Sequence, residues 1–248
     1  MNAIIIAAGS GKRISKNVKN MPKSMVLVNE KPIIEYQISV LKQVGVDEII
    51  VITGPHSEKF SLENVHYIKD QNYTEHDILA SLMEAKKFLK NDVLVIYSDI
   101  IFEKQIILQI LKSKKDISIA IDMNWEKMYE GRTDHPTSEA ENVLLKNENK
   151  ILKIKKNIKN VDNNVGEFLG IMKMTSKGVK QFVEEYEKLI KNHKGKFHEA
   201  PSILKAYVTD MIQELVNLKI NVEPVLISGK WCEIDTLQDL KKAEIIFK

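Results

Sequence analysis

Cysteine is almost absent from this sequence of 248 residues, in which Cys232 is the only one. A single cysteine excludes an internal disulfide framework and a cysteine-rich zinc site, and it suits a reducing compartment. Long apolar runs are missing as well, because no stretch reaches the ~18 apolar residues that a membrane-spanning helix needs. The apolar run at the N-terminus is too short for a secretory signal and has no basic flank. We therefore expect a cytoplasmic protein with no membrane partner.

Neither sign of charge is in large excess. The 37 Lys and Arg residues face 34 Asp and Glu residues, which gives a formal net charge of +3. Because this excess is spread over many ionised groups, it does not form the basic surface that releases counterions from nucleic acid, and we expect no nucleic-acid partner. A local anion site stays open. Aromatic residues are few, at 6%, but 44% of residues are hydrophobic, so a chain of this length can bury a sizeable core.

Short β-branched runs alternate with helical patterns over the first two thirds of the chain. This alternation is typical of parallel strands joined by crossover helices. Pro32 is placed to occupy the first position of a helix that Gly45 ends, and Asp77 is placed to cap another. The pattern predicts an α/β fold with a Rossmann-like, doubly wound and mostly parallel sheet and helices on both faces. The predicted strands are 4–7, 48–53, 65–68, 93–97 and 117–121.

The alternation breaks beyond Asp122. Residues 124–142 are polar and lack a clear period, and long loops inside compact domains are usually functional. Thr236 and Asp239 form a capping-box pattern that opens a last helix. Between these segments the sequence predicts a hairpin at 143–145 and 151–154, strands at 168–174 and 224–227, and helices at 177–192 and 203–218.

A glycine-rich turn follows the first predicted strand, with the sequence Ala7-Ala8-Gly9-Ser10-Gly11-Lys12-Arg13. Backbone N–H groups in such a turn can converge on phosphate oxygens. A Walker A loop requires Ser or Thr after Gly-Lys, where Arg13 stands, and a dinucleotide-binding fingerprint requires a third glycine, where Ile14 stands. The glycines alone leave open a phosphate-binding turn and an ordinary turn at the end of a strand.

Together with Pro22-Lys23, this loop resembles the signature of nucleotide-sugar and related nucleotidyltransferases. The resemblance continues through residues 31–36, 51–54, Asp99 and 231–236, so it spans nearly the whole chain. The compact length, the Glu-Ile-Asp ending and the lack of a long C-terminal β-helix make the chain most similar to the small cytidylyltransferases that act on phosphocholine or 2-aminoethylphosphonate. The resemblance implies a GT-A-like fold in a single domain, residues 1–248. Residues 1–122 would form a nucleotide-binding half, and 123–248 a half that binds the acceptor through a small insertion and completes the metal site.

The implied reaction is attack of an acceptor phosphate or phosphonate oxygen on the α-phosphorus of CTP, with pyrophosphate leaving. An ionised acceptor needs no general base, so charge neutralisation and in-line positioning remain. The resemblance assigns this neutralisation to Arg13 and Lys23, and Mg²⁺ binding to Asp99 and Asp235, because Mg²⁺ prefers oxygen ligands. Asp99 by itself could equally be a helix cap. Expected nucleotide contacts are Ala7, Ala8, Gly9, Ser10, Gly11, Lys12, Thr53, Gly54, Asn72 and Ser81.

The acceptor is expected to bind at the irregular stretch and the segments that follow it. An aromatic face with carboxylates suits a cationic ammonium group, and Arg or His suits a phosphoryl group. The candidate residues are Asp122, Trp125, Arg132, His135, Glu139, Glu141, Glu167 and Glu233. Two alternatives stay open. Trp125 and Tyr129, four residues apart, could pack one face of a short helix against the sheet, and His135 could brace a turn.

Two other functions are compatible with the same residues. The chain could be a nucleotidyltransferase for a sugar 1-phosphate, or a regulatory domain that binds nucleotide without catalysis. A regulatory domain would need the glycine loop but not both metal carboxylates, so the presence of Arg13, Lys23, Asp99 and Asp235 together favours an enzyme. The expected partners are CTP and a small phosphorylated or phosphonate acceptor, and a homodimer is one option for the assembly.

Overall fold

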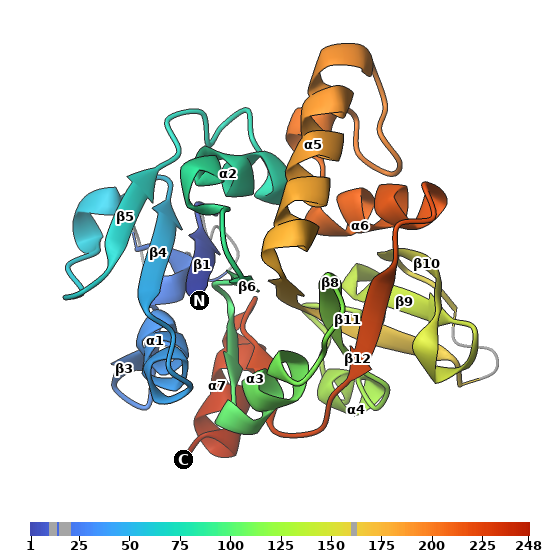
Figure 1. Ribbon diagram of the computed structural model, residues 1–248. Helices are drawn as coiled ribbons and strands as arrows, with labels where there is room; N and C mark the ends of the chain where they lie inside the picture. Colours follow the sequence, from blue (N-terminus) through green and yellow to red (C-terminus); the bar gives the residue numbers. More distant parts are fainter. Residues whose placement is uncertain (10–13, 15–20, 160–162) are drawn as a thin grey trace.

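The computed structural model of the protein describes residues 1–9, 14, 21–159 and 163–248 (Figure 1). The strands are β1 (Asn2–Ala7), β2 (Leu27–Val28), β3 (Lys31–Pro32), β4 (Glu48–Thr53), β5 (His66–Lys69), β6 (Val93–Tyr97), β7 (Ile100–Phe102), β8 (Ile117–Asp122), β9 (Glu141–Leu145), β10 (Ile151–Lys156), β11 (Val165–Met174), β12 (Val222–Leu226) and β13 (Trp231–Glu233). The helices are α1 (Ile33–Gln43), α2 (Ile78–Glu84), α3 (Lys104–Leu111), α4 (Glu126–Tyr129), α5 (Ser176–Asn192), α6 (Val208–Asn217) and α7 (Leu237–Ile246).

Nine of the described strands form one mixed sheet, whose main path runs in the order β10-β9-β11-β6-β1-β4-β5. Strands β6, β1, β4 and β5 run parallel to one another. The long strand β11 is antiparallel to β6, β8 and β9, and β12 extends the sheet by pairing with β8 in parallel. The parallel part follows the predicted strand and helix alternation, whereas β11 joins it to the second half of the chain.

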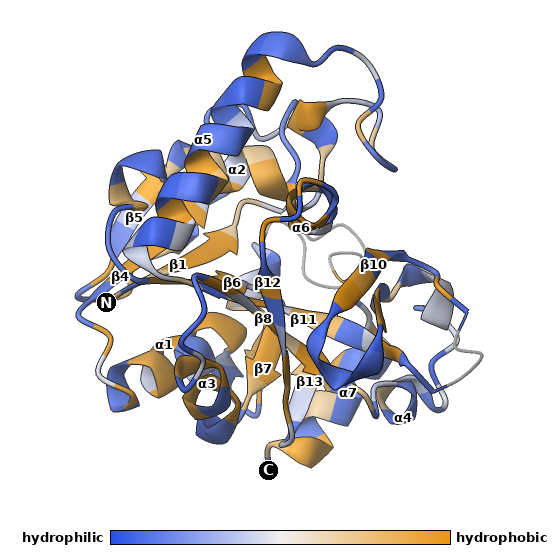
Figure 2. Cartoon of the chain, turned by 45° about the vertical axis from the view of Figure 1, so that its right-hand side comes forward, coloured by the Kyte–Doolittle hydropathy of each residue, from blue (hydrophilic) through white to orange (hydrophobic). Residues whose placement is uncertain are grey.

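Helices cover both faces of the sheet, which confirms the predicted α/β class. Helices α2, α5 and α6 lie on one face and α1, α3 and α7 on the other (Figures 1 and 2). Alternate side chains of β1 enter the two layers: Ile4 and Ile6 pack in the first core cluster, and Ile5 packs in the second. This is the period of two expected for a strand buried on both sides. Burying each such isoleucine contributes about 1.5–3 kcal/mol to the stability.

Two short strands, β7 and β13, lie beside the end of β6, and the sequence pattern did not predict β7. They pair in antiparallel fashion, with Glu233 opposite Ile100. At three residues each, they are too short for a readable periodicity. Their pairing has a large consequence, because the backbone N–H of Ile234 donates to the carbonyl of Asp99 at 2.8 Å. The segment that contains Asp235 is thereby fixed beside the end of β6.

Most predicted elements agree with the structure, and β4 and β6 have the predicted bounds. The predicted helix 203–218 is interrupted, because the Asp210 carboxylate accepts a hydrogen bond from the backbone N–H of Tyr207 at 2.8 Å and so caps α6 at its beginning. Pro32 precedes α1 instead of occupying its first position, and Gly45 follows the helix with a φ of +79°, as expected of a stop signal. In the described part of the chain, no helix is both long and apolar enough to cross a bilayer.

Candidate active site

Two adjoining cavities open where β1 and β6 end. The first has a volume of about 330 Å³ and the second about 290 Å³. They share a wall that includes Gly9, Lys23, Tyr97 and Asp99. The carboxyl ends of parallel strands are where open α/β sheets bind their ligands. The arrangement therefore offers room for two ligands that meet at Lys23.

Lys23 is the charged centre of this shared wall. Its ammonium group donates a 2.8 Å hydrogen bond to Oδ2 of Asp99 and another to Oδ1 of Asp235. Burial alone would lower the pKa of Lys23, but the carboxylates of Asp99 and Asp235 outweigh it and raise the pKa above its ordinary value. Burial would likewise raise the pKa of Asp235, yet the charges of Lys23 and His135 hold it below the ordinary value. The lysine is therefore a fixed cation at neutral pH.

Asp235 is held from several directions between β13 and α7. Its backbone N–H donates to Oδ2 of Asp239 at 3.1 Å, and the same oxygen accepts from the backbone N–H of Thr236 at 2.8 Å in the predicted capping box. Nδ1 of His135 lies 2.8 Å from Oδ2 of Asp235. The other oxygen of Asp239 contacts Nε of Arg132 at 2.7 Å. Such outer contacts fix the orientation of a carboxylate that binds a ligand.

The donor set at this point fits a divalent metal ion. Asp99 and Asp235 each direct a carboxylate oxygen at the Lys23 ammonium group. Donor atoms of His135, Glu233 and Asp235 lie within 4.8 Å of one another. Hard oxygen donors of this kind are the ligands that Mg²⁺ prefers. The structure thus brings together the two aspartates that the sequence selected, through the pairing of β7 and β13.

The second cavity contains part of the predicted nucleotide site. Ala7, Ala8, Gly9 and Ser81 line it, whereas Ser10, Gly11, Lys12 and Arg13 lie outside the described residues. Thr53, Gly54 and Asn72 are absent from the described lining of both cavities. Thr53 is buried and Asn72 lies exposed on the following loop. Gly54 lies against the backbone of Ala8, because a Cβ atom on Gly54 would stand 2.3 Å from the carbonyl oxygen of Ala8.

The first cavity has a strongly acidic lining. Of the predicted acceptor residues, His135, Glu139, Glu141, Glu167 and Glu233 line it. With Asp77, Asp99 and Asp235, the described lining residues include seven carboxylates against only two lysines, Lys23 and Lys156. The aromatic lining consists of Tyr97, Phe168, Tyr207 and Trp231. Acidic groups and aromatic faces together favour a cationic ligand group.

Burial changes the protonation of these carboxyl groups. It raises the pKa of Glu141 to about 8, against the opposing effects of the Lys156 ammonium and the Tyr97 hydroxyl, which donates to Glu141 at 3.3 Å. Burial also raises the pKa of Glu167 to about 8, although Tyr129 donates a 2.6 Å hydrogen bond to it. A bound cation would favour the ionised forms and offset the cost of burying them.

Three of the predicted acceptor residues, Asp122, Trp125 and Arg132, lie outside the described lining of both cavities. Trp125 is 3% exposed, its indole N–H donates to the Val165 carbonyl at 3.0 Å, and its ring packs edge-on against Tyr129. The alternative of a short helix packed on the sheet therefore describes this pair, and Trp125 does not present an aromatic face to a ligand.

Asp122 and Arg132 lie behind the cavity wall. Asp122 is buried, and its carboxylate accepts a 2.8 Å hydrogen bond from the indole N–H of Trp231, a residue that lines the cavity. The Arg132 side chain is 4% exposed and pairs with Asp239. Both residues support lining residues from outside, so the expectation of direct acceptor contacts does not match their placement.

Sequence reasoning overlooked several lining residues. Tyr97 ends a predicted strand two residues before Asp99, and this position was the one available signal. Lys156 ends β10 and Tyr207 precedes α6, and neither stands in a recognisable motif. Lys156 lies over the ring of Tyr207, with its ammonium group 4.8 Å from the ring centre. The hairpin and the break before α6 bring these two side chains to the cavity.

Comparison with known proteins identifies similar chains. The family profile described as "MobA-like NTP transferase domain" matches residues 3–137. The CTP:phosphoglutamine cytidylyltransferase of Campylobacter jejuni is 28% identical over 97% of this chain and 98% of its own length. The choline-phosphate cytidylyltransferase of Streptococcus pneumoniae is 36% identical over 42% of this chain and 47% of its own length.

Solved structures show the same fold along the whole chain. The structure of the CTP:phosphocholine cytidylyltransferase from Streptococcus pneumoniae aligns with a TM-score of 0.71 and 25% identity, covering 100% of this chain and 99% of that one. The inositol-1-phosphate CTP transferase from T. maritima aligns with a TM-score of 0.76 at 20% identity, covering 100% of this chain and 95% of that one, and supports the fold alone.

Proposed function

This chain belongs to the MobA-like NTP transferase domain family and is a nucleotidyltransferase, and from this premise we propose that it transfers a cytidylyl group from CTP to a small phosphorylated or phosphonate acceptor that carries a cationic group. The relatives named as cytidylyltransferases support the choice of CTP, and the acidic lining of the first cavity supports the choice of acceptor. Mg²⁺ is the proposed metal ion.

The observation that carries the proposal is the wall shared by the two cavities. The second cavity begins at the glycine turn, as expected of a triphosphate site, and the first contains the acidic pocket. Lys23 and Asp99 face both. A nucleotide in one cavity and an acceptor in the other would therefore meet where the lysine can neutralise the charge of reacting phosphoryl groups.

In the proposed reaction, an oxygen of the acceptor phosphate or phosphonate forms a bond to the α-phosphorus of CTP. The bond from this phosphorus to the oxygen that bridges it to the β-phosphate breaks, and pyrophosphate leaves with the electron pair. The acceptor oxygen is already ionised near neutral pH, so Lys23 has no proton to remove and acts through its charge. Asp99 and Asp235 would hold Mg²⁺, which when bound would offset the negative charge of the phosphates.

The proposed acceptor carries an ammonium group. Glu139, Glu141 and Glu167 line the same cavity as the aromatic side chains of Tyr97 and Tyr207. A cation between carboxylates and aromatic faces gains Coulomb and cation–π energy at once and favours the ionised forms of Glu141 and Glu167, whereas a neutral sugar gains neither. Lys156 adds one positive charge to the same lining, so an acceptor with both an ammonium and a carboxylate group also fits this pocket.

Release of pyrophosphate tests the proposal directly. The protein is incubated with Mg²⁺, one nucleoside triphosphate and one acceptor, and the acceptor panel contains phosphocholine, 2-aminoethylphosphonate, phosphoglutamine, inositol 1-phosphate and glucose 1-phosphate. We expect release with CTP and the acceptors that bear an ammonium group. Release with UTP and glucose 1-phosphate alone would replace the proposal with the sugar-nucleotide alternative, and no release with any pair would support a nucleotide-binding regulatory role.

Glu141→Gln tests the acceptor's charge. The substitution keeps the size of the side chain and removes its negative charge. We expect KM for the acceptors with an ammonium group to rise about tenfold, the effect of about 1.4 kcal/mol, while KM for CTP stays within twofold. The matched control is Glu187→Gln, which removes a surface charge on α5 that pairs with Lys86. Equal KM values in Glu141→Gln and the unsubstituted protein would contradict an ammonium subsite at Glu141.

A further inference from the structure

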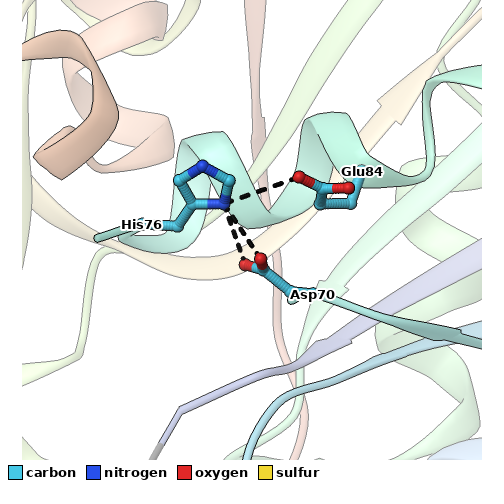
Figure 3. A group of neighbouring side chains, drawn as sticks. All are labelled: Asp70, His76 and Glu84. Atoms are coloured by element: carbon cyan, nitrogen blue, oxygen red, sulfur yellow. Dashed lines mark hydrogen bonds and ion pairs between the residues drawn. The ribbon is translucent and has the colours of Figure 1, made fainter. Parts of the chain in front are cut away.

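A second group of ligand-type side chains lies beside α2, apart from Asp99 and Asp235. Asp70 follows β5, His76 precedes α2 and Glu84 ends α2. Figure 3 shows the three side chains pointing toward one another, with Nδ1 of His76 facing both carboxylates. One donor atom from each residue lies within 4.8 Å of the other two. An imidazole nitrogen with two carboxylate oxygens is a ligand set that Zn²⁺ and related dications accept.

The spacing of the donor atoms fits a metal-centred polyhedron. Nδ1 of His76 lies 3.0 and 3.1 Å from the two oxygens of Asp70 and 3.7 Å from Oε1 of Glu84. Tetrahedral zinc bonds of about 2.0–2.1 Å place neighbouring ligand atoms about 3.3–3.4 Å apart. The observed separations lie on both sides of this value. Small side-chain rotations would therefore suffice to seat an ion among the three groups.

Asp70 is held as an oriented ligand would be. Its carboxylate is fully buried, and it accepts hydrogen bonds from the Ser81 hydroxyl at 2.7 Å and from the backbone N–H of Asn72 at 2.8 Å. The backbone of Asp70 is fixed as well, because its N–H donates to the Thr53 carbonyl at 2.8 Å. Outer hydrogen bonds of this kind set ligand orientation and raise metal affinity. The less buried Glu84, 34% exposed, leaves a route for an ion to enter.

The charge of the group matches a dication. Two carboxylates and a neutral imidazole sum to −2, and in the described ranges the ion-pair partner of both Asp70 and Glu84 is His76 alone. We propose that Asp70, His76 and Glu84 form a binding site for a transition-metal dication of the zinc type, which fastens the loop after β5 to α2. His76 and Ser81 line the second cavity, so the proposed site borders the space proposed for the nucleotide.

The site can be tested by titration of the metal-free full-length protein with Co²⁺ in excess Mg²⁺, which fills the harder oxygen site. We expect one Co²⁺ per chain with the strong visible absorption of a four-coordinate ion, and displacement by Zn²⁺. Glu84→Gln and His76→Asn should each weaken this binding at least about tenfold. Asp235→Asn should leave it unchanged, which separates this site from the proposed catalytic metal site.

The control is a histidine–glutamate pair without a third ligand. His198 and Glu214 lie 2.9 Å apart, and no further ligand group among the described residues joins them. Glu214→Gln should leave Co²⁺ binding intact. Thermal unfolding of each metal-free variant shows whether it has folded, and His76→Asn serves if Glu84→Gln has not. Equal affinity in the unsubstituted protein and in a folded His76 or Glu84 variant would overturn the proposal and leave an ion pair. Loss of the signal in Asp235→Asn would also overturn it.

Discussion

Lys23 bridges the carboxylates of Asp99 and Asp235, which lie far apart in the sequence, and its proposed role follows from that position. Lys23→Ala should lower kcat at least about a hundredfold, because the positive charge between the proposed nucleotide and acceptor sites is lost. Asp235→Ala should have an effect of the same size. Pyrophosphate release at saturating CTP and acceptor measures both, with circular dichroism to check the fold. Lys156→Ala is the control, since it removes a lysine of the same cavity and should affect the acceptor KM more than kcat.

Turnover close to that of the unsubstituted protein would remove the substituted residue from the mechanism. The Lys23 variant is informative for a second reason. Without its ammonium group, Asp99 and Asp235 lose the cation that they share, so the metal-free variant should be less stable, and added Mg²⁺ should restore more stability to it than to the unsubstituted protein.

Glu141 predicts a pH dependence of stability. Its pKa is about 8 in the folded protein and close to 4.5 in the unfolded chain, so the folded state binds more protons between these values. Stability should therefore fall as pH rises from 4.5 to 8, by at most about 1.4 kcal/mol per pH unit from this group. Glu141→Gln should flatten that slope. Urea unfolding of the ligand-free protein at pH 5, 6.5 and 8 measures it, and parallel curves for the two proteins would show that Glu141 is not the source.

The residues that sequence could and could not predict differ in a physical way. Lys23, Asp99 and Asp235 lie in the segments that resemble the nucleotidyltransferases, and in the structure they meet in the wall of the first cavity. The sequence left two placements of Trp125 open, because an aromatic residue in a polar stretch looks the same whether its ring faces a ligand or the core. Its place was decided by Tyr129 and by the Val165 carbonyl, a partner forty residues away. Long-range packing of this kind leaves no local signal.

At the level of elements, the capping box of α7 links helix stability to the site. Thr236→Ala removes the cap and should cost about 1 kcal/mol. Asp239→Ala should cost about 3 kcal/mol, because it also leaves the buried Arg132 without its 2.7 Å partner. It should lower kcat as well, since Asp235 loses its backbone anchor. Thr175→Ala provides the comparison. The Thr175 hydroxyl caps α5 by accepting from the backbone N–H of Gly178, so this substitution should cost about as much stability as Thr236→Ala and leave kcat unchanged.

Denaturant unfolding and turnover measured on the same preparations test this order of effects. A kcat for Asp239→Ala equal to that for Thr175→Ala would show that the anchor of Asp235 is dispensable.

The helices and strands also show where prediction from sequence stops. Long periodic segments such as β4 and α5 were predicted within one residue, whereas β7 and β13 exist only as a pair, and their three residues carry no period of their own. The proposed Mg²⁺ site depends on that pair.

For the whole molecule, β11 is the strand that unites the two parts of the chain. It pairs with β6 of the first 122 residues and with β9 of the later ones, so a single sheet passes beneath both cavities. The acidic first cavity takes lining residues from each side of this strand. The near balance of 37 basic and 34 acidic residues therefore hides a strong local separation of charge, which only the folded arrangement reveals.

This continuity predicts one cooperative unfolding transition. Trp125 and Trp231 are both buried and both belong to the later half, so tryptophan fluorescence reports on that half, whereas far-UV circular dichroism reports on the entire chain. If the halves unfold together, the two signals should have the same urea midpoint. CTP at a hundred times its Kd, with Mg²⁺, should stabilise the folded protein by about 2.7 kcal/mol. Both urea midpoints should therefore rise equally. A fluorescence midpoint below that of circular dichroism, or a CTP shift confined to one signal, would show that the later half unfolds on its own.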